Sequence, residues 1–256
     1  MSGLILVTGG TGTLGRAVVR ELLERGERVR VLSRNPRPTG DDRDCEWATG
    51  DLDSGVGIEA AVAGADVVVH CATSFTKGDE AGARRVIECA RQADRKPHLV
   101  YISIVGIDRV PMPYYKMKRR VEELFEESGL AWTILRTTQF HNLLARITLS
   151  QRWLPFALAF RAPFQPIEVD EVAARLAELA VAAPAGRVAD MGGPQVVSGS
   201  ELARRTLRAA GRRRLVVPLR LPGRAFRAVR DGALLAPEQT RGSGTFEEFL
   251  SETVRV

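Results

Sequence analysis

The stretch Thr8-Gly9-Gly10-Thr11-Gly12-Thr13-Leu14-Gly15 decides the fold of this 256-residue chain. It follows the apolar run Leu4 to Val7 and precedes the helical pattern Arg16 to Arg25, which predicts a strand, a glycine turn and a helix in succession. Glycines at this spacing allow a sharp turn, leave a surface without side chains beside a phosphate, and let the helix pack closely on the strand. The helix N-terminus directs N–H groups and partial positive charge at the same place. We therefore expect Thr8 to Gly15 to bind a pyrophosphate.

Short apolar, β-branched runs alternate with helical patterns through the rest of the first half. This alternation is typical of a parallel sheet with right-handed crossovers. The predicted strands are Leu4 to Val7, Val29 to Leu32, Val67 to His70, Leu99 to Ile102 and Trp132 to Leu135, with a weaker one at Cys45 to Ala48. The predicted helices are Gly15 to Arg25, Glu80 to Ala93, Tyr115 to Ser128 and Asp170 to Ala182. We expect an α/β fold, a Rossmann-type doubly wound parallel sheet with ligands beyond the carboxyl ends of its strands.

The pattern loosens after about residue 150, where Trp153 to Phe164 is rich in proline and aromatic residues. The sequence then predicts a short extended segment at Gln165 to Ile167, a strand at Arg187 to Met191, and a helix at Ser200 to Ala210 with Ser200 as its N-cap. No linker of Gly, Ser or charged residues separates the halves. We expect residues 1–150 to form the nucleotide-binding core and residues 151–256 to form a small substrate-binding cap packed on it.

The composition limits the partners and the compartment. The net charge of +6 comes mostly from arginines, many of them after residue 200, but no aromatic interleaving or nucleic-acid motif accompanies them. Three cysteines without metal-ligand spacing indicate a reducing cytoplasm and no metal site. The chain has no charged leader and no apolar run near 20 residues. We expect a cytoplasmic protein with a small-molecule substrate and no nucleic-acid or membrane partner, and we leave homo-oligomer formation open.

The end of the second predicted strand indicates which dinucleotide binds. An acidic residue there would bond the 2′-hydroxyl of the adenosine ribose, whereas this chain has Ser33-Arg34. A guanidinium beside a hydroxyl matches a 2′-phosphate, so NADP(H) is favoured over NAD(H). The alternative is a surface arginine in an arginine-rich chain.

Two further loops follow predicted strands. Asp51-Leu52 after the third strand and Ala72-Thr73-Ser74 after the fourth lie where loops would contact the adenine and the middle of the cofactor. Taken alone, Asp51 is equally typical of a turn or a helix cap.

The segment Tyr114-Tyr115-Lys116-Met117-Lys118 carries the candidate chemistry. Tyr114 and Lys118 are four residues apart on one face of a predicted helix. At roughly 4 Å and an effective dielectric of about 20, their attraction is about 4 kcal/mol, which lowers a tyrosine pKa by at most about three units. That shift would bring the phenol within range of acid–base catalysis at neutral pH. A packing role for Tyr114 or Tyr115 is the alternative.

With both signals the chain resembles the short-chain dehydrogenase/reductase superfamily, and most closely its atypical NmrA-like branch of NAD(P)-binding proteins. The resemblance covers nearly the whole chain. Its residues are Thr8 to Gly15, Gly50-Asp51-Leu52, Val100 to Ser103, Tyr114 to Lys118, Ser128-Gly129-Leu130, Thr133 to Arg136 and Gly192-Gly193-Pro194.

The resemblance implies roles for three residues. Tyr114 would exchange a proton with the substrate, and Lys118 would bond the nicotinamide ribose and lower the tyrosine pKa. Ser103 stands where the family serine would lie, although in many relatives that position is nearer Val105, which would supply no hydrogen-bond donor. Several atypical members lack the tyrosine or have no known reaction.

The sequence after the sixth predicted strand suggests a substrate pocket. Gln139, Phe140 and His141 stand at the edge where a substrate would meet the nicotinamide, and His141 is either a proton donor or a helix-start residue. Five aromatic residues either line an apolar pocket or fill the core: Phe75, Trp153, Phe156, Phe160 and Phe164.

The leading hypothesis is an oxidoreductase, an NADPH-dependent reductase of a carbonyl or a conjugated enone or quinone in a small, largely apolar substrate. Two alternatives remain: a non-catalytic NADP(H)-binding sensor of NmrA-like type, and a sugar-nucleotide epimerase-like enzyme. The epimerase is less favoured because such enzymes usually carry a longer C-terminal domain and a clear serine.

Overall fold

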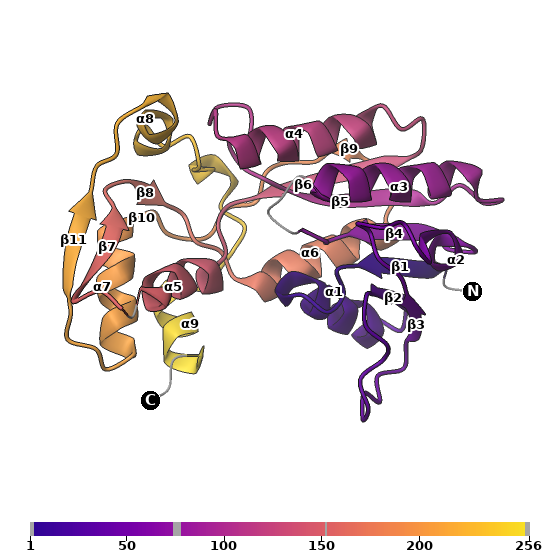
Figure 1. Cartoon of the computed structure of the whole chain (residues 1–256), viewed down its shortest axis with the longest axis horizontal. Helices are drawn as coiled ribbons and strands as arrows, with labels where there is room; N and C mark the ends of the chain where they lie inside the picture. The colour runs from indigo at the N-terminus through magenta and orange to yellow at the C-terminus, as the bar shows by residue number, and fades with distance from the viewer. Residues whose placement is uncertain (1–2, 74–77, 152, 254–256) are drawn as a thin grey trace. The chain divides into compact units, whose positions relative to one another are not determined.

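A seven-stranded parallel sheet forms the centre of the computed structural model, which describes residues 3–73, 78–151 and 153–253 (Figure 1). The strand order is β3-β2-β1-β4-β5-β6-β9. The bounds are β1 (Leu4–Thr8), β2 (Arg28–Ser33), β3 (Glu46–Thr49), β4 (Val67–His70), β5 (His98–Ile104), β6 (Trp132–Thr137) and β9 (Gly186–Arg187). Because the order reverses beside β1, the chain winds in two directions, which confirms the predicted α/β, Rossmann-type doubly wound fold.

Helices cover both faces of the sheet (Figure 1). On one face lie α1 (Thr13–Glu24) and α6 (Val169–Val181), and on the other lie α2 (Ile58–Val62), α3 (Gly78–Gln92) and α4 (Pro113–Glu126). Both faces of the strands are therefore buried, which explains their continuous apolar runs. In β1, all five residues are buried.

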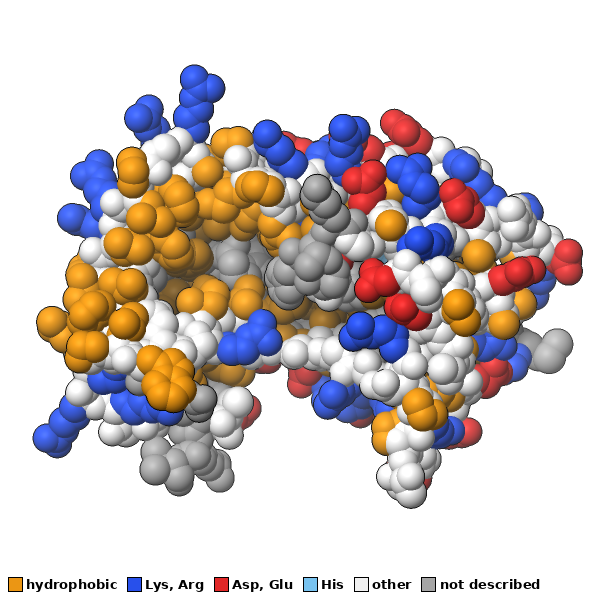
Figure 2. All heavy atoms as spheres, viewed as in Figure 1, with side chains coloured by type: hydrophobic (Ala, Val, Ile, Leu, Met, Phe, Trp, Pro, Cys, Tyr) orange, Lys and Arg blue, Asp and Glu red, His pale blue; other side chains and the backbone are white. Residues whose placement is uncertain are grey.

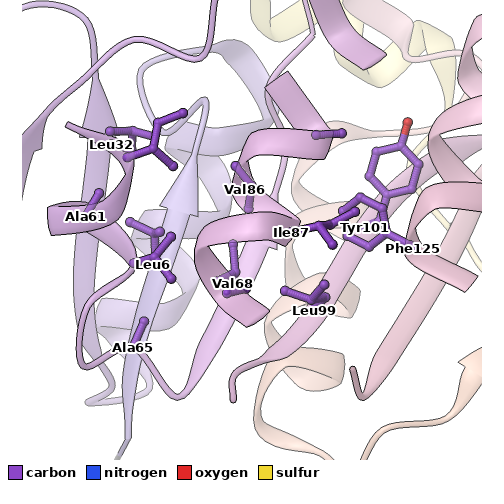
Figure 3. Packing of buried hydrophobic residues seen from close by; sticks show 14 of the residues in the cluster. Leu6, Leu32, Ala61, Ala65, Val68, Val86, Ile87, Leu99, Tyr101 and Phe125 are labelled. Atoms are coloured by element: carbon purple, nitrogen blue, oxygen red, sulfur yellow. The ribbon is translucent and has the colours of Figure 1, made fainter. Parts of the chain in front are cut away.

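The core beneath α3 and α4 joins apolar side chains of five strands, β1, β2, β4, β5 and β6, to those of the helices (Figure 3). Val86 and Ile87 of α3 meet Leu6, Val68 and Leu99 of the sheet. At one end of this cluster the ring of Tyr101 stacks on Phe125 of α4, with ring centroids 4.8 Å apart. A tyrosine that is 1% exposed in β5 thus fixes the position of α4 relative to the sheet.

The chain divides into two compact units. Unit 1 contains Met1–Ser103, Pro113–Leu135 and Val172–Val188, and unit 2 contains Ile104–Met112, Arg136–Glu171 and Ala189–Val256. Besides α5 (His141–Ser150), unit 2 contains β7 (Phe156–Phe160), β8 (Pro163–Phe164), β10 (Val197–Ser198), α7 (Gly199–Ala209), β11 (Leu215–Leu219), α8 (Arg224–Arg230), η1 (Pro237–Gln239) and α9 (Phe246–Thr253). The two units are defined by their internal contacts and not by the ligands they bind. The expectation that residues 1–150 bind the cofactor and residues 151–256 bind the substrate therefore stays a prediction.

Two expectations for the second half need correction. The N-cap of α7 is Ser198 rather than Ser200, since the Ser198 hydroxyl accepts the N–H of Glu201 at 3.2 Å. Of the predicted strand Arg187 to Met191, only Arg187 lies in β9, and Met191 forms a separate bridge with Thr137. The segment Gln165 to Ile167 follows β8, and its Ile167 forms a bridge with Phe140. No helix within the described residues is long and apolar enough to cross a membrane.

Candidate functional site

The glycine turn between β1 and α1 has the geometry that its spacing predicts. Gly9 has a φ of +68°, in the left-handed region, and its carbonyl accepts the N–H of Gly12 at 2.9 Å. A Cβ at Gly15 would lie 2.1 Å from the Gly9 oxygen. Any side chain at Gly15 would therefore push α1 away from the turn.

The same turn leaves the start of α1 open. Gly12 has an ordinary extended backbone, with φ −79° and ψ 176°, and a Cβ there would meet only the Gly9 oxygen, at 3.2 Å. Thr11, Gly12 and Thr13 are exposed, no side chain caps the helix, and its first turn has no acidic residue. The residues present thus fit the pyrophosphate of a dinucleotide, which the free N–H groups would bind.

The loops after β2 and β3 meet at one edge of the sheet. Ser33 ends β2, and its hydroxyl accepts the N–H of Asn35 at 3.2 Å, while Arg34 is exposed. The pKa of Asp51 is lowered, first by the N–H of Asp53 and in smaller part by the charge of Arg34. Arg34 and Asp51 therefore lie close enough to interact, at the edge where the adenosine would bind. Leu52 lies against Gly82 of α3, where a Cβ would come within 3.0 Å of it.

A chain of hydroxyl groups follows β4. The hydroxyl of Thr73 donates to a carboxylate oxygen of Asp79 at 2.6 Å and lies 3.4 Å from the Tyr114 hydroxyl. Thr73 thus links the Asp79 carboxylate to the phenol of Tyr114. Ala72, just before Thr73, lies against Gly9, where a Cβ would come 2.7 Å from the Ala72 backbone. Ser74 and Phe75 lie outside the described residues.

Lys118 is buried in α4, 4% exposed. Its Nζ donates to the carbonyl oxygen of Ile102 at 3.2 Å and lies 4.4 Å from the ring centroid of Tyr101. Burial lowers the pKa of Lys118 to about 8, although Asp79 and Glu122 oppose the shift. A buried lysine whose pKa lies this close to neutral pH is typical of a functional site.

The pKa of Tyr114 is raised, which is opposite to the lowering that the sequence predicts. Burial of the phenol is the largest cause, Asp79 adds to it, and the hydrogen bond with Thr73 acts in the other direction. The ammonium of Lys118 points to Ile102 and Tyr101, and the shift of the Tyr114 pKa is set by burial, Asp79 and Thr73 instead.

Ser103 lies near the end of β5, one residue beyond the carbonyl that Lys118 binds. Its side chain is 2% exposed, and its hydroxyl has no hydrogen-bond partner among the described residues. A buried hydroxyl without a partner costs about 1–3 kcal/mol, so a ligand that bonds it gains affinity. Val105, the alternative position, is fully buried, and its N–H donates to the carbonyl of Thr137.

The three predicted pocket residues after β6 lie together in unit 2. Phe140 is the N-cap of α5, which His141 begins. The amide of Gln139 and the Nε2 of His141 are buried without a hydrogen-bond partner among the described residues. The other ring nitrogen, Nδ1, lies 3.1 Å from a carboxylate oxygen of Glu168. Burial raises the pKa of Glu168, but hydrogen bonds from His141 and Val169 outweigh it, so the net shift is downward.

Two site residues, Asp79 and Glu168, were missed by the sequence analysis. Asp79 lies in the first turn of α3, an ordinary place for an acidic residue, and only the fold brings it to Thr73. Glu168 precedes α6 and reaches His141 across 27 residues of sequence. The proximity of Asp79 to a predicted cofactor loop was the one available signal.

The fold and the glycine turn define a Rossmann-type dinucleotide-binding protein. A family model described as NAD(P)H-binding matches residues 9–152, more than half of the chain. The chain belongs to this NAD(P)H-binding family, and its cofactor is NAD(P)H.

Sequence relatives extend the comparison. A (4-alkanoyl-5-oxo-2,5-dihydrofuran-3-yl)methyl phosphate reductase of Streptomyces griseus is 30% identical over 221 residues, 82% of this chain and 74% of the relative. The photosystem II assembly factor Ycf39 of Cyanophora paradoxa is 33% identical over 148 residues, 53% of this chain. The chain spans only 45% of the length of this Ycf39.

The fold of a solved structure also matches. The NADPH-dependent quinone oxidoreductase of Escherichia coli, complexed with NADPH, superposes with a TM-score of 0.82 at 18% identity, covering 96% of this chain and 98% of the other. At this identity the likeness shows the shared fold.

Proposed function

We propose that the protein is an NADPH-dependent reductase of a carbonyl or conjugated enone in a small, largely apolar substrate. The observation that carries the proposal is a pair of buried polar groups at the end of β5. The ammonium of Lys118 binds the Ile102 carbonyl, and the hydroxyl of the next residue, Ser103, has no hydrogen-bond partner in the described part of the chain. Both groups are held inside the protein with fewer partners than burial requires, which a bound cofactor and substrate would supply. The similarity to the dihydrofuranylmethyl phosphate reductase of Streptomyces griseus supports the assignment to the reductases.

Each residue has a distinct role in this proposal. Bound NADPH would supply the hydride. Lys118 would hold the nicotinamide ribose, Ser103 would donate a hydrogen bond to the substrate oxygen, and Tyr114 would give that oxygen its proton. The raised pKa of Tyr114 keeps the phenol protonated at neutral pH, as a proton donor requires. Thr73 and Asp79 position the phenol oxygen through the hydroxyl chain.

The proposal has three further parts. The protein prefers NADPH to NADH, it belongs to the NmrA-like branch, and its two halves bind different ligands. Arg34 would bind the 2′-phosphate of NADPH, since its guanidinium places a positive charge at the end of β2. Residues 1–150 would bind the cofactor, and residues 151–256 would bind the substrate. Gln139, Phe140 and His141 remain predicted substrate contacts.

Substitution of the tyrosine tests the reaction. Tyr114→Phe removes the proton donor and should lower kcat at least about tenfold with the affinity for NADPH unchanged. Tyr115→Phe is the matched control, because its ring contacts Tyr114 edge-on but it takes no part in the proposed step. Steady-state NADPH oxidation with quinones, enones and ketones is the measurement. Equal turnover of Tyr114→Phe and the unchanged protein would remove Tyr114 from the mechanism.

A second candidate function is a cofactor-binding sensor without chemistry. The lack of any lowering of the Tyr114 pKa favours it, since a phenol tuned for both directions of proton transfer would have a lower pKa. The similarity to Ycf39, whose name describes an assembly factor, points the same way. A protein that binds NADPH but oxidises none of it with the whole substrate panel would support the sensor.

A further inference from the structure

The parallel pair β7 and β11 in unit 2 has two different faces. Leu215, Val217 and Leu219 of β11 lie opposite Phe156, Leu158 and Phe160 of β7 in the strand register. The residues between them, Ala157, Ala159 and Val216, pack against Ala203 and Leu207 of α7. Since side chains alternate along a strand, the three cross-strand pairs form the opposite face. We call these six residues the apolar sheet face: Phe156, Leu158, Phe160, Leu215, Val217 and Leu219.

This apolar sheet face is only partly covered. Leu215 is 72% exposed and Phe160 is 40% exposed, whereas the other four residues are half-buried. Phe226 of α8 closes one end, because its ring stacks on Phe160 with centroids 5.8 Å apart. Figure 2 shows the hydrophobic side chains gathered over β7, β11 and α8. Contiguous apolar side chains that remain exposed on a folded protein are typical of a binding surface.

The excess positive charge of the chain lies entirely in unit 2. Unit 2 has 17 arginines, no lysine and 11 acidic residues, whereas unit 1 has 20 basic and 20 acidic residues. Residues 211–230, which include β11 and all of α8, have seven arginines and no acidic residue. The surroundings of the apolar sheet face therefore favour an anion.

Four exposed arginines stand at the Phe160 end of the face. Arg161 and Arg220 follow the last residues of β7 and β11, and the Arg161 N–H donates to the carbonyl of Leu219 at 3.0 Å. Arg224 and Arg227 flank Phe226 on α8. Within the described ranges no ion pair is formed by these four side chains, which we call the arginine end.

We propose that the apolar sheet face and the arginine end bind an amphiphilic anion, a single hydrocarbon chain with a phosphate or carboxylate head. The hydrocarbon would lie on the sheet face, and the arginines would bond the head. Four of the six apolar residues are half-buried, so only part of each side chain is accessible, which suits one hydrocarbon chain rather than the plane of a membrane. The inference is separate from the proposed function, because no step of the proposed reduction takes place at this site.

Binding of non-reducible probes tests the inference separately from catalysis. We would titrate the NADPH-loaded protein with octyl phosphate, 1-octanol and ethyl phosphate by calorimetry. Octyl phosphate should bind at least about tenfold more tightly than either of the others, because only it uses both the apolar face and the arginines. Equal affinities for octyl phosphate and 1-octanol, or binding only to phosphatidylglycerol vesicles, would overturn the inference.

Charge reversal locates the head group. Arg161→Glu with Arg227→Glu should weaken octyl phosphate at least about fivefold and leave 1-octanol unchanged. The matched control, Arg212→Glu with Arg213→Glu, makes the same charge change at exposed positions before β11 and should have less than about a twofold effect. Circular dichroism would verify that both variants fold. If both double variants lost the same affinity for octyl phosphate, net charge alone would explain the effect. That result would contradict the assigned site.

The two proposals fail in different ways. Probe binding without NADPH oxidation on any substrate would remove the reductase but keep the anion site. NADPH oxidation with neutral enones, together with no preference for octyl phosphate, would keep the reductase and remove the anion site.

Discussion

Lys118 is a residue whose burial opposes stability and whose proposed function would explain that burial. Its ammonium is buried with one backbone carbonyl and one aromatic ring as contacts, and burial lowers its pKa from 10.5 to about 8. A depressed lysine pKa means that the folded protein binds this proton less tightly than the unfolded chain does. The burial of the charge is therefore a cost to stability that a methionine would avoid.

The pH dependence of unfolding reveals that cost. Below pH 8 both states are protonated and the cost is present in full. Between about pH 8 and 10.5 the folded protein releases the proton first, so its stability rises relative to Lys118→Met, by at most about 3 kcal/mol. Urea denaturation at pH 7.5, 9 and 10 measures the difference, with Lys116→Met, an exposed lysine of the same helix, as the control. A difference that does not change with pH would contradict the lowered pKa.

Arg34 tests cofactor choice at a single side chain. Arg34→Ala should raise the Kd for NADPH about tenfold and the Kd for NADH less than about twofold, because only NADPH has a phosphate on the adenosine ribose. Fluorescence titration of each cofactor is the measurement. Arg28→Ala is the control: Arg28 lies at the other end of β2 and pairs with Glu46 at 3.2 Å. Equal losses for the two cofactors would disprove the role of Arg34.

Single residues show where sequence reasoning ends. Tyr114 and Lys118 were found because their spacing is local, four residues on one helix. Their partners were not found, because Thr73 and Ile102 reach them only through the order of the strands. The raised pKa of Tyr114 follows from burial, which the spacing of two residues does not reveal.

At the scale of elements, two glycines of the turn between β1 and α1 are expected to have different roles, one in packing and one in cofactor binding. Gly15 is needed for packing, since a Cβ would collide with the Gly9 carbonyl, whereas Gly12 has a backbone that alanine adopts freely. Gly12→Ala should change the free energy of unfolding by less than about 1 kcal/mol. It should weaken NADPH at least about tenfold, because its methyl group occupies the open start of α1.

The companion variant provides the contrast. Gly15→Ala should lower the free energy of unfolding by more than about 2 kcal/mol, since α1 must shift to relieve a 2.1 Å contact. Thermal unfolding and NADPH titration of both variants are the measurements. Unchanged NADPH affinity in a well-folded Gly12→Ala variant would place the pyrophosphate elsewhere.

Elements with strong apolar periodicity were predicted well, and the weaker strand Cys45 to Ala48 and the helix Ser200 to Ala210 were also confirmed, as β3 and α7. The strands that became β1, β2, β4, β5 and β6 and the helices that became α1, α3, α4 and α6 were expected within a few residues. The strand β11 was not expected, because Leu215 to Leu219 contains a proline and follows three arginines. Its parallel pairing with β7 depends on contacts about 60 residues apart in sequence, which local patterns do not encode.

At the scale of the whole molecule, charge is distributed by unit. The charges of unit 1 balance, although its cofactor is an anion, so local N–H groups and Arg34 rather than net charge would bind NADPH. Unit 2 has the excess of arginine around an apolar face. This separation lets a general electrostatic field attract an anionic ligand to the unit that is proposed to bind it.

Salt distinguishes this field from the apolar contribution. Raising the salt concentration from 50 to 300 mM shortens the screening length from roughly 14 Å to roughly 6 Å. The Kd for octyl phosphate should rise about threefold or more, because its head group is attracted by exposed arginines, whereas the Kd for 1-octanol should stay constant or fall. The Arg161→Glu, Arg227→Glu variant should lose most of this salt dependence. Equal salt effects on the phosphate and the alcohol would show that the charge of unit 2 does not act on the ligand.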